Sequence, residues 1–167
     1  AIAKQRIETF FERVARMVRK EQQDVNITDL VLFLGGDLIN GSLHLDTAES
    51  DEIAQPIEQA IECQALIEGG LNYLLNNANV KRITIPCCDG NHGRITQKQH
   101  WTSRQGNALE YYMYYNLSKR LPECKWIFSP GLLIYQQVYD WTVRFHHGDT
   151  IHFGGIKGPM EYLTRAI

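Results

Sequence analysis

The stretch from residue 80 to residue 94 constrains the fold of this chain more than any other. Residues 80–85 are a short, β-branched run that predicts a strand, and the sequence PCCDGNHGR follows directly. Its two glycines allow the backbone to turn sharply on either side of Asn91 and His92. An amide oxygen and an imidazole are therefore expected at the carboxyl end of a strand, where open α/β sheets bind their ligands. Taken alone, the same residues are equally compatible with an ordinary turn.

Two further predicted strands end in a similar way. Residues 30–34 form a continuous apolar run, which predicts a strand covered on both faces, and a glycine pair and Asp37 follow it. Residues 141–145 predict a strand that leads into His146 and His147. Ligand-type side chains are thus expected at three strand ends.

Helical patterns alternate with these strands. Near the start of the chain, apolar residues recur at the spacing of one helix face, and the set expected to face inward is Ile7, Phe10, Phe11, Val14, Met17 and Val18. A second helix is predicted from Pro56 to about Leu75, because proline suits a first helical turn. A third helix is predicted over residues 105–121. Its expected inward-facing residues are Leu109, Tyr112, Met113 and Leu117.

The part of the chain after the third helix predicts a different kind of sheet. Three strand-like runs follow one another there, at residues 125–128, 132–138 and 141–145. Pro130-Gly131 and Tyr139-Asp140 supply tight turns between them, so these strands are expected to be antiparallel. No internal repeat or linker divides the chain, and residues 1–167 are therefore expected to form a single α/β domain.

Composition and charge narrow the functional classes. The 167 residues carry a formal net charge of -2, which argues against a strongly basic coat for nucleic acid. The sequence has no apolar run of membrane-spanning length and no secretory signal pattern, so we expect no membrane partner and a cytoplasmic location. The four cysteines lack Cys-x-x-Cys spacing and are expected to be reduced, buried thiols.

The polar residues at the three strand ends are candidate metal ligands. Asp37 supplies a carboxylate, Asn91 an amide oxygen, and His92, His146 and His147 supply imidazoles. An acid placed against an apolar strand needs a cation or hydrogen-bond donors. Oxygen and imidazole donors suit manganese, iron, zinc or magnesium rather than copper.

The strand ends carry the segments GDLIN, GNH and HG, at residues 36–40, 90–92 and 147–148. These segments resemble the second, third and fourth motifs of the calcineurin-like metallophosphoesterases. The pattern is most similar to phage and bacterial members related to the double-strand-break repair nucleases. The resemblance implies two packed, mixed β-sheets flanked by helices. It also implies two divalent ions at the strand ends, with manganese as the first choice.

The resemblance implies a role for each of the site residues. Asp37 would bridge both ions, while Asn91 and His147 would bind the second one. His92 would protonate the leaving-group oxygen, because an imidazole near neutral pH suits general acid catalysis. His147 is the implied ligand rather than His146, because the ligand histidine of the family is followed by glycine.

The chain also departs from the family pattern. The first motif, Asp-x-His, and the last, Gly-His-x-His, do not occur in the sequence. The chain is therefore expected to be a fragment that holds the middle of the site and binds at most one ion. Asn40 stands where many members have a second acid, and Gly93-Arg94 replaces the common acid after the histidine. Arg94 is expected to contact a substrate phosphate.

These features predict a metal-dependent phosphoesterase, and within that class a phosphodiesterase or nuclease acting on DNA. Residues 95–104 form a polar, basic loop that carries Trp101 and suits a phosphodiester backbone; a solvated loop before the third helix is the alternative. A phosphomonoesterase and a metal-free binding scaffold with the same fold also stay open. Nucleic acid and a second copy of the chain, in a homodimer, are the candidate partners.

Overall fold

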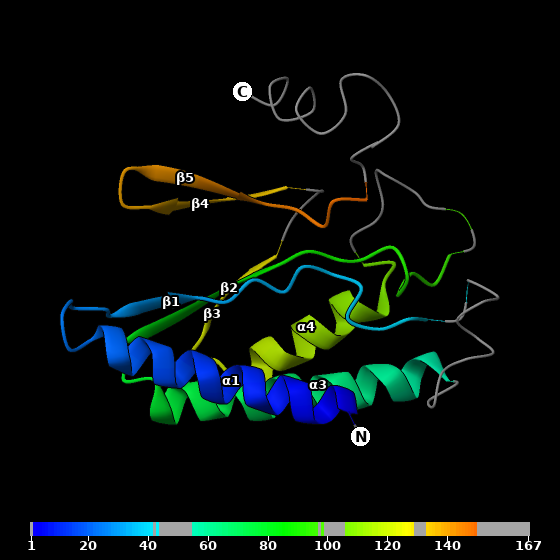
Figure 1. Cartoon of the computed structure of the whole chain (residues 1–167). Coiled ribbons are helices and arrows are strands. Elements are labelled where there is room, and N and C mark those ends of the chain that lie inside the picture. Colours follow the sequence, from blue (N-terminus) through cyan, green and yellow to red (C-terminus); the bar gives the residue numbers. More distant parts are fainter. Residues whose placement is uncertain are drawn as a thin grey trace, which may run out of the picture.

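The chain begins with a helix, alternates strands with helices, and continues into a hairpin. The computed structural model describes residues 2–41, 43, 55–96, 98, 106–128 and 133–149. The elements are α1 (Ile2–Glu21), β1 (Asp29–Val31), α3 (Pro56–Asn77), β2 (Arg82–Cys87), α4 (Leu109–Arg120), β3 (Lys125–Phe128), β4 (Ile134–Val138) and β5 (Trp141–Phe145). In the described part of the chain they form three layers, with the helices on one face of a parallel sheet and the hairpin over its other face (Figure 1).

The central layer is a three-stranded parallel sheet with the order β1-β2-β3. Pairing with β2 continues beyond the regular part of β1, because the Leu32 amide donates to Thr84 O and the Leu34 amide to Pro86 O. The predicted strand at residues 30–34 therefore does run along β2. It is not covered on both faces, however, since Val31 is 38% exposed on what is an edge strand in the described sheet.

The direction of β3 corrects a prediction. We expected β3 to be antiparallel to the strands that follow it, but β3 pairs parallel to β2, with Ile85 opposite Trp126. The reason is the intervening helix α4. It returns the chain to the edge of the sheet where β2 begins, as the helix of a β-α-β connection does. The fold is α/β as predicted, with a parallel sheet and a separate two-stranded antiparallel sheet.

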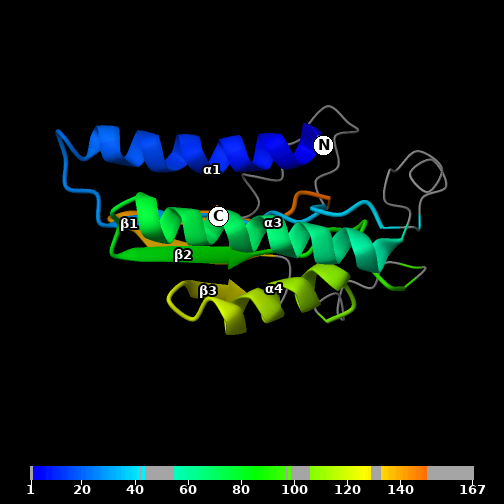
Figure 2. The ribbon, with the colours of Figure 1, turned by 90° about the horizontal axis from the view of Figure 1, so that it is seen from below.

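The helices α1, α3 and α4 lie side by side and cover one face of the parallel sheet (Figure 2). The core between them and the sheet includes Leu71, Leu74, Ile83, Ile85, Met113, Tyr114 and Leu117. Phe11 and Val18 face inward as predicted, but Phe10, Met17 and Tyr112 are exposed. Fewer residues of α1 are buried than the helical periodicity predicted. The reason is that α1 packs on α3 through Phe11, whose ring occupies the space beside Gly70. No helix in the described part is long and apolar enough to cross a membrane.

The hairpin of β4 and β5 is antiparallel as predicted, with Val138 opposite Trp141 at its turn. It contacts the parallel sheet through Phe145, whose ring centroid lies 4.9 Å from that of Phe33. Phe33 lies just beyond β1, and Phe145 is the last residue of β5. The hairpin therefore meets the sheet at the carboxyl end of β1, and the chain leaves β5 there.

The cysteines are free thiols, as predicted. Cys87, Cys88 and Cys124 are buried, and Cys63 is half-buried. Burial raises the pKa of the Cys124 thiol to about 11, which makes it a poor nucleophile at neutral pH. These residues are consistent with a packing role.

Candidate metal centre

The turn after β1 presents Asp37 at the end of the strand. Gly36 has φ 85° and Asp37 has φ 53°, so two successive residues adopt the left-handed conformation. A Cβ on Gly36 would lie 2.5 Å from the Gly90 nitrogen, closer than side-chain atoms approach backbone. Glycine is therefore required at position 36 both by the backbone conformation and by close contact with the second turn.

The turn after β2 lies directly against the first. A Cβ on Gly90 would collide with the backbone nitrogen and Oδ1 of Asp37. The His92 amide donates to Asp37 Oδ1 at 2.9 Å. Arg94 reaches back within the same turn and donates from Nη1 to the Asn91 carbonyl. The two ligand-type segments, 50 residues apart in sequence, are thus one packed unit.

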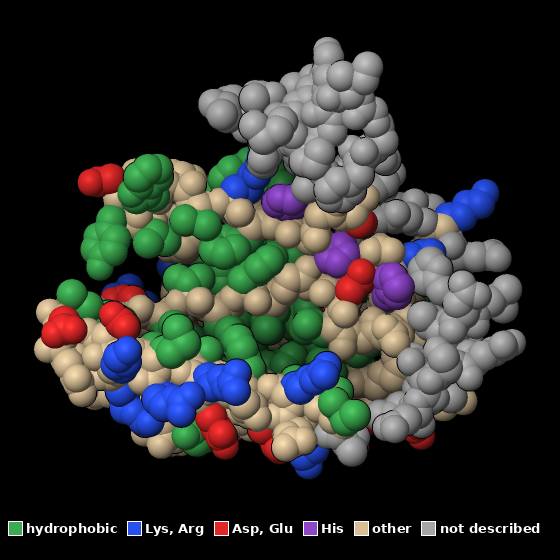
Figure 3. Space-filling model, viewed as in Figure 1, with side chains coloured by type: hydrophobic (Ala, Val, Ile, Leu, Met, Phe, Trp, Pro, Cys, Tyr) green, Lys and Arg blue, Asp and Glu red, His purple; other side chains and the backbone are tan. Residues whose placement is uncertain are grey.

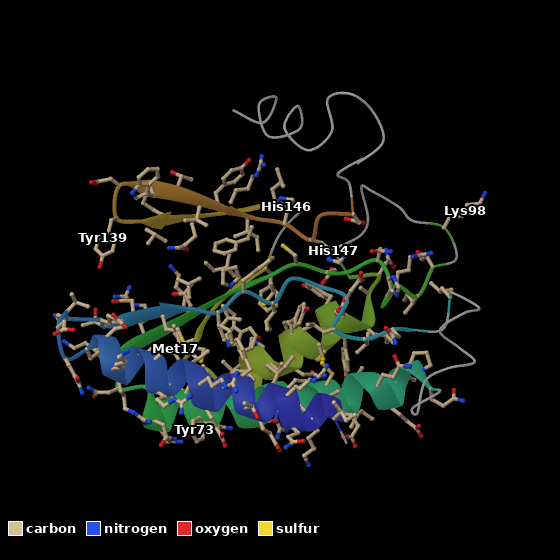
Figure 4. The ribbon with its side chains drawn as sticks, in the orientation of Figure 1. Met17, Tyr73, Lys98, Tyr139, His146 and His147 are labelled. Atoms are coloured by element: carbon tan, nitrogen blue, oxygen red, sulfur yellow. The ribbon has the colours of Figure 1, made fainter. Side chains whose placement is uncertain are left out.

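His147 completes the cluster from the segment after β5. Its Nε2 lies 3.0 Å from Asp37 Oδ2 and 3.0 Å from Asn91 Oδ1, and its Nδ1 lies 2.7 Å from the Gly35 carbonyl. Figure 4 shows His147 between the hairpin and the parallel sheet, close to the ends of the strands. The structure therefore brings together the three predicted ligands Asp37, Asn91 and His147.

The contact with the Gly35 carbonyl places a proton on Nδ1 of His147. A carbonyl can only accept a hydrogen bond, so Nδ1 carries the proton that binds Gly35 O. In the neutral ring, Nε2 then points a lone pair at two oxygen atoms. That arrangement is repulsive unless a proton or a metal cation lies among the three atoms. A histidine whose Nδ1–H bonds a backbone carbonyl is the usual arrangement of a metal ligand.

The donor set fits one hard or borderline divalent ion. A carboxylate oxygen, an amide oxygen and an imidazole nitrogen converge, and they suit manganese, iron, zinc or magnesium. Within the described residues there is no group of three or more His, Cys, Asp and Glu side chains that could hold an ion. The third ligand of this set is an asparagine.

The charges of the cluster are coupled. Burial would raise the pKa of the Asp37 carboxyl, but the hydrogen bond from His147, the His92 amide and the charges of both rings outweigh it and lower the pKa to about 2. The hydrogen bond to Asp37 raises the pKa of His147, and burial opposes that rise. Without metal, these contacts therefore favour the carboxylate of Asp37 and the imidazolium of His147.

The remaining predicted residues lie around this centre. The His92 ring nitrogen Nε2 is 3.9 Å from Asp37 Oδ2, beyond hydrogen-bonding distance, and its side chain is 30% exposed. Histidine and acidic side chains gather at this point of the surface in Figure 3, in agreement with the Asp37 contacts. His146 does not point toward Asp37, and burial lowers its pKa. Trp101 and Arg104 lie outside the described residues, and Lys98 is exposed.

Two residues at the centre were not predicted. Glu110 is fully buried, and its carboxylate accepts the Leu38 and Gly90 amides, both at 2.6 Å. Gln59 accepts the amides of Asn40 and Gly41 through Oε1. A signal existed for Glu110, because it lies on the same helix face as the inward residues Met113 and Leu117. An acidic residue among inward-facing apolar residues of a helix needs a buried hydrogen-bond donor.

Comparisons with known proteins add no assignment: no family model, no curated protein and no solved structure matches this chain.

Proposed function

We propose that this chain forms the middle of a calcineurin-like metallophosphoesterase site that hydrolyses phosphodiester bonds. The observation that carries the proposal is the position of His147 Nε2, 3.0 Å from both Asp37 Oδ2 and Asn91 Oδ1. Three ligands from three strand ends far apart in sequence face one point, in the order of the family motifs. The parallel sheet, its helix layer and the hairpin over its other face are compatible with that family's two-sheet fold.

The protein residues divide the chemistry among them. Asp37, Asn91 and His147 would hold the ion, which would supply Lewis-acid chemistry toward a phosphate when bound. Asp37 is held in place by the His92 amide, and His147 by the Gly35 carbonyl. The His92 ring, part-exposed beside Asp37, is positioned to protonate the leaving oxygen.

The number of ions follows from the ligands. Three protein ligands, with water completing the shell, hold one ion. The family's first ion uses Asp-x-His and Gly-His-x-His motifs, which these 167 residues do not contain. We therefore expect this chain to bind one ion weakly, with manganese the first choice. Turnover is expected only where a second set of ligands is also present.

The proposed substrate is a nucleic-acid strand, with DNA as the first choice. Arg94 supports this because its guanidinium lies against Asn91, where it can contact a phosphate held at the ion. Lys98 is an exposed cation in the loop that follows. If both contact DNA, Lys98→Gln should lower the slope of log affinity against log salt by about one unit, and an unchanged slope would remove the loop from the interface.

The experiment that tests the function measures Mn²⁺ and phosphate together on this chain. Bound Mn²⁺ should broaden the ³¹P signal of thymidylyl-thymidine, a phosphodiester, because phosphate binds beside the ion. Asp37→Asn should abolish the broadening, since an amide neutralises a cation poorly. His92→Ala, a matched control in the same cluster, should keep Mn²⁺ affinity within a factor of about two.

The outcomes separate the alternatives. Broadening of a phosphomonoester but not of the diester would favour the phosphomonoesterase. No Mn²⁺ binding by the wild-type chain would favour the metal-free scaffold, in which Asp37 and His147 form only an ion pair.

A further inference from the structure

Glu110 is a buried acid that connects the two ligand-bearing turns. Its side chain is fully buried at the start of α4, and each of its oxygens accepts one backbone amide at 2.6 Å. Burying a carboxylate in an apolar core is costly unless it is hydrogen-bonded. Burial raises the pKa of Glu110, and the two N–H bonds oppose that rise because they favour the ionised form.

The two amides belong to the residues next to the ligands. Leu38 directly follows Asp37, and Gly90 directly precedes Asn91. One carboxylate therefore links the two turns that carry the Asp37 carboxylate and the Asn91 amide oxygen. Gln59 makes similar bonds, but both of them go to the first turn.

The helix that carries Glu110 is fixed to the second turn. The Leu109 amide donates to Gly93 O at 2.9 Å, just after His92. A Cβ on Gly93 would lie 3.2 Å from Glu110 Cγ, so little space remains for the side chain to shift. The carboxylate is thus held from its own helix as well as from the turns it binds.

We propose that Glu110 is a positioning residue that holds Asp37 and Asn91 at the separation needed to bind one ion with His147. This inference rests on the proposed function, because it assigns a role toward the same ion. Glu110 is not itself a ligand: it is fully buried, and both of its oxygens are committed to backbone amides. Outer residues that orient metal ligands typically contribute ten- to a hundredfold to metal affinity.

The test compares Glu110→Gln with Glu68→Gln in the full chain. The first change keeps the size of the side chain but turns an NH₂ group toward one of the two amides. The second makes the same chemical change in a surface pair with Arg120. Mn²⁺ titration followed by electron paramagnetic resonance should show affinity lowered about ten- to a hundredfold in Glu110→Gln and unchanged in Glu68→Gln.

Two further measurements keep the test decisive. Hydrogen exchange of the metal-free protein should be faster at the His92 amide in Glu110→Gln, because that amide reports contact between the turns. If Glu110→Gln does not fold, Glu110→Asp retains the charge but is too short to reach both amides, and the same loss of affinity is expected.

The contrary outcomes are distinct. A folded Glu110 variant that binds Mn²⁺ as tightly as the wild type, with only a lower melting temperature, would overturn the positioning role and leave the proposed function intact. A wild-type chain that binds no Mn²⁺ would overturn both.

Discussion

The two ends of the β4–β5 hairpin differ in how they meet the parallel sheet. At one end, Phe145 packs on Phe33, and His147 bonds to Asp37 and to the Gly35 carbonyl. At the other end, Tyr139 is 91% and Trp141 77% exposed. A cavity of about 380 Å³ separates that end from the sheet, lined by residues of both layers that include Thr84, Lys125, Gln136 and Val138. Figure 4 shows His147 and Tyr139 at opposite ends of this layer.

The difference shows that the hairpin meets the sheet closely at the end where Asp37, Asn91 and His147 converge. In the proposed function, the segment after β5 would supply one ligand, and the turns after β1 and β2 would supply the other two. Docking of the hairpin and assembly of the centre are therefore expected to depend on each other. Changes at the ligand end should affect both stability and metal affinity, and changes at the turn end should affect neither.

The largest effect is expected from Gly90→Ala, which separates the two ligand-bearing turns. The new methyl group would collide with the backbone of Asp37, where no flexible side chain can yield. We expect a loss of about 3 kcal/mol in the free energy of unfolding, measured in urea, and loss of Mn²⁺ binding.

Gly69→Ala is the matched control. A Cβ at Gly69 meets nothing within 4 Å, and this glycine lies inside helix α3. The substitution should raise stability by about 0.5–1 kcal/mol and leave Mn²⁺ affinity unchanged. Equal effects of the two substitutions would contradict the close contact of the turns.

Phe145→Ala should release the ligand end of the hairpin. It removes the ring that packs on Phe33, two residues before His147. We expect about 2 kcal/mol lower stability, because Phe145 is only half-buried, and about tenfold weaker Mn²⁺ binding. Calorimetric titration checks the affinity. A variant that loses stability but binds Mn²⁺ as the wild type does would show that docking and the centre are independent.

The pH dependence of the stability of the metal-free protein tests the contact between Asp37 and His147 at the ligand end. The pKa of Asp37 is lowered from 3.8 to about 2, so its contribution to stability is lost as the pH falls through that range. The pKa of His147 is raised above 6.5, so its contribution is present below pH 6.5 and is lost as the pH rises through the raised value.

Stability with EDTA should therefore be highest between about pH 4 and 6.5. In Asp37→Asn, the fall in the free energy of unfolding should be smaller by about 1 kcal/mol on both the acid and the alkaline side of this range. The effect is this small because solvent weakens a part-exposed pair. Urea titrations across this range check the prediction. A wild-type profile that already matches the variant would show that the ion pair contributes nothing.

The smallest effect is expected at the turn end. Trp141 is 77% exposed, so Trp141→Ala should change stability by less than about 0.5 kcal/mol and leave Mn²⁺ affinity unchanged. The same urea and titration measurements apply. A loss as large as that of Phe145→Ala would mean that both ends hold the hairpin equally.

The sequence indicated that Asp37, Asn91 and His147 would lie together, but it did not indicate the residues that hold them in place. Asp37 and Asn91 could be anticipated because each follows a strand of the parallel sheet, whose carboxyl ends meet at one edge. His147 follows β5 of the antiparallel hairpin, so its place beside them was indicated only by the family resemblance. Glu110 was missed because its partners are backbone amides at Leu38 and Gly90, which have no signature in residue type. Only its position on an apolar helix face indicated an unusual acid.

Other differences have the same origin in tertiary packing. Helical periodicity favoured both Phe10 and Phe11 for the core, but contact with α3 beside Gly70 selects Phe11. The α4 crossover brings β3 beside β2, so the turn predicted at residues 130–131, which lie outside the described residues, favoured the wrong neighbour. Local patterns predicted where most elements lie and that β4 pairs with β5, but they did not predict the partner of β3.

The most direct test of the metal centre is pulsed electron paramagnetic resonance of one Mn²⁺ bound to this chain. We predict a single ion with one coordinated imidazole nitrogen. That nitrogen signal should disappear in His147→Ala and persist in His146→Ala. Two strongly bound ions, a signal that survives in His147→Ala, or one that is lost in His146→Ala would contradict the assignment of Asp37, Asn91 and His147 as the ligands.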